Sequence, residues 1–69
     1  MKKGDKVICI KPYVRKNRYG NILDNFKENF IYEIADVHGD RIFVFKENNI
    51  DFRSFKYRPK FCNYFLIYN

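Results

Sequence analysis

The chain has 69 residues, a net charge of +6, eight phenylalanines and six tyrosines. A chain of this length forms one domain at most, and it buries only about 60% of the surface that it exposes when unfolded. No apolar run approaches the roughly 18 residues of a transmembrane helix, and no apolar stretch of signal-peptide length follows the opening MKKGDK. These features exclude a multidomain or membrane-spanning architecture and predict a soluble cytoplasmic protein.

Charge is unevenly distributed along the chain. Residues 1–20 contain seven Lys or Arg and one acid, residues 21–51 contain three bases and seven acids, and residues 52–69 contain four bases and no acid. If the two basic ends lie side by side in the fold, they form one positive face. Such a face attracts polyanions and accelerates their encounter.

Five segments have the composition of β-strands. Each is rich in β-branched or aromatic residues and is bounded by turn residues. In chain order they are Asp5–Ile10, Phe30–Val37, Arg41–Lys46, Phe52–Tyr57 and Phe61–Tyr68. The strongest local signal is a hairpin around Gly39, since glycine adopts positive φ without strain.

The connections between these strands differ in length. Tyr13–Asn29 has no clean hydrophobic period and contains several asparagines, so we predict a long first loop, which in a small domain is usually functional or mobile. Arg58–Lys60 is expected to form a single 3₁₀ turn before the last strand. Five short strands with these connections predict an all-β fold, a small five-stranded SH3-like barrel, in which the first and last strands are neighbours.

Two blocks of the sequence resemble the small SH3-like proteins of tailed phages and related bacteria. That family reads Lys-x-Gly-Asp-x-Val-x-Cys-Ile, then a loop, Gly-x-x-Tyr-x-Val, a Gly/Asp hairpin and a terminal Arg-Phe. The matching residues are Gly4, Asp5, Val7, Cys9, Ile10, Tyr32, Ile34, Val37, Gly39, Asp40, Ile42 and Val44, with Phe61 for the terminal Phe. Asn29 and Lys60 replace the expected Gly and Arg. The resemblance implies a phage-encoded binding or accessory role without catalytic activity, in the cytoplasm of the host cell.

The first loop is the main candidate for a binding surface. Its opening, KPYVRKNRYGN, combines basic and aromatic side chains, as phosphate contacts and base stacking require. The predicted contacts to nucleic acid or to an acidic host or phage protein are Lys11, Tyr13, Arg15, Lys16, Arg18, Tyr19, Arg53, Lys56, Arg58 and Lys60. The alternative is a solvated loop whose charges maintain solubility.

Phe43 and Phe45 are candidates for protein contact. If Ile42 and Val44 face the core, the alternation of side chains along a strand turns both phenylalanines outward. They then contact a partner protein or a second copy in a homodimer, or the first loop covers them. The apolar run Tyr64–Tyr68 poses the same alternatives. A module that docks on and modulates another protein, including an anti-defence inhibitor, and a self-assembling structural protein therefore remain open beside nucleic-acid binding.

Catalytic and metal chemistry are not expected. The chain has two cysteines and one histidine, too few for a disulfide framework or a zinc site. We predict Cys9 and Cys62 as reduced core residues that pair only if their strands adjoin and the compartment is oxidising. There is no Ser-His-Asp set and no glycine-rich phosphate loop. The sequence predicts a non-enzymatic protein without metal or cofactor.

Overall fold

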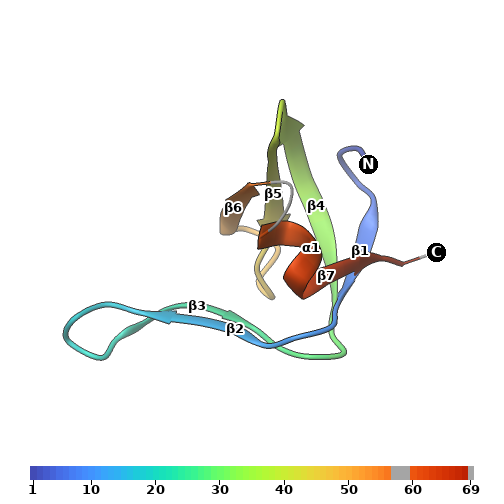
Figure 1. Cartoon of the computed structure of the whole chain (residues 1–69). Coiled ribbons are helices and arrows are strands. Elements are labelled where there is room, and N and C mark those ends of the chain that lie inside the picture. Colours follow the sequence, from blue (N-terminus) through green and yellow to red (C-terminus); the bar gives the residue numbers. More distant parts are fainter. Residues whose placement is uncertain (57–59, 69) are drawn as a thin grey trace.

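The computed structural model describes residues 1–56 and 60–68. These residues form seven strands and one short helix (Figure 1). In chain order they are β1 (Lys6–Cys9), β2 (Tyr13–Lys16), β3 (Ile22–Phe26), β4 (Ile31–His38), β5 (Arg41–Phe45), β6 (Phe52–Lys56), α1 (Lys60–Tyr64) and β7 (Phe65–Ile67). The chain is therefore mostly β, as the sequence predicts, but it has more strands than the five expected.

Five strands form one antiparallel sheet in the order β6-β5-β4-β1-β7. They correspond to the five strands predicted from the sequence. β1 lies between β4 and β7, with Ile8 opposite Ile31 on one side and opposite Leu66 on the other. The first and last strands are therefore neighbours, as predicted, and β6 and β7 are the outermost strands of an open sheet.

The segment predicted as a long irregular loop is instead a two-stranded hairpin, Tyr13–Phe26, here called the arm. It projects from the rest of the molecule (Figure 1). The Asn17 side-chain oxygen accepts hydrogen bonds from the backbone N–H groups of Tyr19 and Asn21, at 2.9 and 3.0 Å. Gly20 completes the turn at φ 84°. This asparagine turn closes the hairpin at its far end.

The arm lacks the hydrophobic period of a strand because charged residues occupy its inward positions. Tyr13 pairs with Phe26, and Arg15 pairs with Asp24, two residues further along each strand. Tyr13, Asp24 and Phe26 are buried. The inner face of the ribbon is therefore half aromatic and half ionic, and it does not show the apolar alternation by which strands are recognised.

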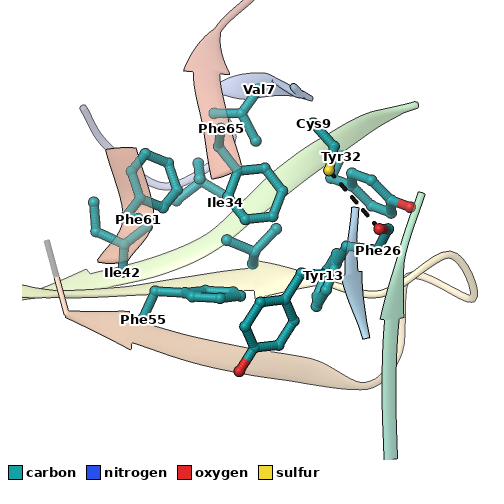
Figure 2. Packing of buried hydrophobic residues seen from close by; sticks show 11 residues of the cluster. Val7, Cys9, Tyr13, Phe26, Tyr32, Ile34, Ile42, Phe55, Phe61 and Phe65 are labelled. Carbon is teal, nitrogen blue, oxygen red and sulfur yellow. Dashed lines mark hydrogen bonds between the residues drawn. The ribbon is translucent and has the colours of Figure 1, made fainter. Parts of the chain in front are cut away.

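Edge-to-face aromatic contacts dominate the core (Figure 2). The ring of Phe26 lies 5.0 Å from Tyr32, 5.7 Å from Phe55 and 5.5 Å from Phe65, measured between centroids. These are the separations and tilted geometries that aromatic pairs prefer. Because Phe26 belongs to the arm, this ring anchors the arm in the core of the main sheet.

The C-terminal segment differs from the predicted long last strand, and residues 58 and 59 of the predicted 3₁₀ turn lie outside the described residues. Arg58 lies outside the described residues, and Lys60 begins α1, a single α-helical turn. The last strand is only β7. Phe61 and Phe65 are four residues apart and stack at 5.2 Å with an interplanar angle of 22°. Their spacing suits a helix as well as a strand, and an apolar run of this length does not distinguish the two.

The two cysteines occupy different environments. Cys9 is fully buried in β1, and its Sγ lies 3.0 Å from the carbonyl oxygen of Lys11. Burial raises the pKa of its thiol. Cys62 is exposed on α1, and both thiols are free. The predicted core position is confirmed for Cys9 and wrong for Cys62, because a surface helix buries one face only and here that face carries Phe61.

Candidate functional site

The far end of the arm, Lys16–Asn21, is here called the tip. Lys16, Arg18 and Tyr19 are exposed there, and Tyr19 retains 75% of its accessible surface. The Arg18 guanidinium lies 5.2 Å from the centroid of the Tyr19 ring. The tip contains no acid. It therefore presents two cationic side chains and one aromatic face to solvent.

A buried carboxylate, Asp24, holds the base of the arm against the main sheet. Its side chain is 1% exposed. Its Oδ2 lies 2.7 Å from Arg15 Nε of β2 and 3.3 Å from Arg53 Nε of β6, and its Oδ1 lies 2.9 Å from Lys46 Nζ, just after β5. Lys46 Nζ also donates to the carbonyl oxygen of Leu23, at 2.8 Å. Three separate segments thus meet at one carboxylate.

The electrostatics of this cluster keep Asp24 ionised. Burial raises the pKa of the carboxyl, but the hydrogen bonds and charges of Lys46 and Arg15 outweigh burial and leave the pKa below its ordinary value. One negative charge therefore faces three positive charges. The cluster retains a net positive charge at the root of the arm.

Arg15 and Arg53, two of the predicted anion contacts, are thus already ion-paired. Their side chains remain 44% and 29% exposed. They contribute positive potential near the arm, but Arg15 is hydrogen-bonded to Asp24, and Arg53 donates a hydrogen bond to the Tyr13 hydroxyl. The acid that organises them was not predicted, because only the folded chain brings positions 15, 46 and 53 around it. One signal in the sequence could have indicated it: Asp24 lies two residues before the apolar Phe26, and residues two apart in a strand lie on the same face.

Tyr13, predicted to stack on bases, is a core residue. It is 9% exposed, and its ring lies 5.1 Å from Phe55 and 4.9 Å from Tyr64. Its hydroxyl oxygen accepts a 3.3 Å hydrogen bond from Arg53. Its ring is enclosed by these neighbours, so Tyr13 positions the arm and Tyr19 is the exposed tyrosine of the arm.

The structure brings the C-terminal segment beside the base of the arm. Tyr64 of α1 contacts Tyr13, and the Lys11 ammonium lies 5.8 Å from the Tyr64 ring centroid. Lys56 and Lys60 are exposed at the end of β6 and the start of α1. Among the described residues, neither makes an ion pair with an acid. Arg58, the remaining predicted contact, lies outside the described part of the chain.

A second feature lies on the outer face of the main sheet. Phe43 and Phe45 are half-buried there, while Ile42 and Val44 of the same strand are in the core. A hollow of about 320 Å³, here called the aromatic hollow, is lined by Ala35, Asp36, His38, Phe43, Phe45 and Phe52. All six belong to β4, β5 or β6. The arm, which takes the place of the predicted first loop, contributes no residue to the lining of the hollow.

Across residues 1–56 and 60–68, no three His, Cys, Asp or Glu side chains gather closely enough to hold a metal ion. The same residues include no helix with the length and apolar character needed to cross a bilayer. Comparison with protein-family models, curated proteins and solved structures finds no match to this chain.

Proposed function

We propose that this chain is a small, phage-encoded, non-enzymatic accessory protein that binds nucleic acid through the tip of its arm. The observation that carries the proposal is the exposure of Lys16, Arg18 and Tyr19 on a projecting, acid-free turn. Cationic side chains neutralise phosphates, and an exposed aromatic ring provides a face on which a base stacks.

We further propose that the fold is an SH3-like barrel. The order of the main sheet, the pairing of β1 with β7 and the single helical turn before β7 support this assignment. In it, the arm is the elaborated connection between the first two strands of the barrel. The resemblance of the Gly4–Ile10 block to small phage proteins supports the proposed origin.

The shape of the arm suits a nucleic-acid groove. Its two strands are paired in antiparallel register, so the arm is a β-ribbon two strands wide. A two-stranded ribbon fits the roughly 12 Å major groove of duplex DNA. Asp24 and Phe26 fix the base of the ribbon, so the tip is presented in a defined direction.

The distribution of acidic residues on the arm favours a polyanion over a neutral ligand. Asp24, the acid nearest the tip on β3, is buried and outnumbered by its three cationic partners. Lys11, Lys56 and Lys60 add positive charge near the arm base and α1. The arm and the adjoining helix therefore both carry exposed positive charge, and the arm itself has no uncompensated carboxylate.

The test is a direct binding measurement on the purified chain. Fluorescence anisotropy against labelled duplex DNA, single-stranded DNA and RNA is recorded over a series of salt concentrations. We expect binding to at least one of them, with log K falling linearly as log salt rises. No binding to any of the three, or an affinity that does not change with salt, would contradict the proposal.

A second candidate function is docking on a protein, and the aromatic hollow favours it. Three phenylalanines, Phe43, Phe45 and Phe52, line one open depression outside the core. Clustered apolar side chains of this kind mark interaction sites. A pull-down from lysate treated with nuclease separates the two functions. A partner that is retained after nuclease treatment and lost with Phe52→Ser supports docking, and the absence of such a partner counts against it.

A further inference from the structure

The aromatic hollow has a carboxylate at its wall. Asp36 lines it, and the Asp36 Oδ1 accepts a 2.8 Å hydrogen bond from the backbone N–H of Val37. The Oδ2 lies 2.8 Å from His38 Nε2. That hydrogen bond from Val37, together with His38 and Lys3, leaves the pKa of Asp36 below its ordinary value. The hollow thus combines an ionised acid with apolar walls.

The local chain explains why the hollow forms here. The register of β4 against β5 shifts between Ile34 and Asp36, and this irregularity sets Asp36 opposite Phe43. Across the next strand pair, Phe45 stands opposite Phe52. Ala35, with only a methyl group, lies among these larger side chains. The volume of the hollow is at the lower end of the roughly 300–1,000 Å³ range of ligand pockets.

The rings form walls at steep angles to one another. Phe43 and Phe52 lie 5.7 Å apart with an interplanar angle of 77°, and Phe43 and His38 lie 5.8 Å apart at 90°. At each perpendicular contact one ring directs its edge toward its neighbour. The faces of aromatic rings are negative and attract cations. The faces of these rings and the Asp36 carboxylate therefore both attract a positive charge.

We propose that the aromatic hollow binds a basic side chain, lysine or arginine, of a partner protein. The choice of occupant rests on charge complementarity. A neutral apolar side chain would desolvate the Asp36 carboxylate without replacing its lost hydration. A basic side chain buries its methylene stem against the phenylalanines and places its charge beside the acid. In the described residues, the cation–π contacts of the chain's own bases involve Tyr64, Tyr19 and Phe30, not these rings.

This inference rests on the second function, protein docking, and is independent of nucleic-acid binding at the arm. The probes are Nα-acetyl-lysine methylamide and Nα-acetyl-arginine methylamide, whose side chains remain cationic. The matched neutral control is Nα-acetyl-norleucine methylamide. Binding is followed by NMR shifts of the backbone and ring signals. We expect the two cationic probes to shift the NMR signals of Asp36, Phe43 and Phe52. We also expect them to bind about fivefold or more tightly than the norleucine control.

Variants test the two components of the site. Asp36→Asn removes the charge and Phe52→Leu removes one ring at an exposed position, and each is expected to weaken lysine binding several-fold. Asp40→Asn is the control, since Asp40 is an exposed acid outside the hollow. Equal binding of norleucine would overturn the cation inference and leave protein docking standing. Shifts confined to other surfaces, or no shift with either cationic probe, would also overturn it.

Discussion

Replacing Asp24 by asparagine removes the single negative charge on which the base of the arm depends. The side chain keeps its size, but its new amide presents N–H groups to donors from Arg15, Lys46 and Arg53. Removing one partner of a buried ion pair costs about 3–5 kcal/mol. The three cations are 28–44% exposed, so they regain part of their hydration. We therefore expect a loss of about 2–3 kcal/mol in the free energy of unfolding.

That loss is large for a chain of 69 residues. A single small core supplies about 3–5 kcal/mol of net stability, and each kcal/mol shifts the melting temperature of such a domain by about 4–8 °C. Thermal unfolding followed by circular dichroism at pH 7 should show D24N melting roughly 10–20 °C below the wild type. Asp40→Asn makes the same change in net charge at an exposed turn and should melt within about 2–4 °C of the wild type.

The dependence on pH gives a second signature. The pKa of Asp24 is lowered in the folded chain, so its contribution is present above the unfolded value of about 3.9. The contribution is lost as pH falls through the lower folded-state pKa. The difference between the wild type and D24N should therefore shrink in acid. A D24N melting temperature equal to that of D40N, or a gap that persists in acid, would refute the assigned role.

Three other predictions follow from burial. Tyr13→Ala should cost about 3–5 kcal/mol by opening the core, whereas Tyr19→Ala should leave the melting temperature unchanged and weaken binding of single-stranded nucleic acid several-fold. Equal melting temperatures for the two variants would contradict their placement. Ellman's reagent should modify Cys62 in the native chain and reach Cys9 only after unfolding. Rapid labelling of both thiols in the native protein would show that β1 is not enclosed.

The sheet could be predicted because its strands obey simple local rules. Ile42 and Val44 alternate with outward phenylalanines, and Gly39, at φ 57°, closes the turn between β4 and β5. The hairpin follows from that pattern, whereas the adjacency of the first and last strands is predicted from the barrel arrangement of the five strands. Strand alternation and turn chemistry are short-range properties, so one sequence suffices to detect them.

The arm and the ionic cluster could not be predicted in the same way. Asp24 carries a charge where a strand would normally place an apolar side chain, and its partners Lys46 and Arg53 are more than twenty residues away. Tyr13 and Tyr19 are the same residue type in the same segment. Only the pairing of Tyr13 with Phe26 decides that one is buried and the other exposed.

Nucleic-acid binding at the tip is tested most directly by comparing two charge-matched double variants. Lys16→Gln with Arg18→Gln neutralises the tip, and Lys2→Gln with Lys3→Gln removes the same charge at the N-terminus, far from the arm (Figure 1). Each phosphate contact contributes about 0.7–0.9 to the slope of log K against log salt. The tip variant should lower the magnitude of that slope by about 1.4–1.8, and the N-terminal variant should leave it unchanged. Equal slopes for the two variants would contradict binding through the tip.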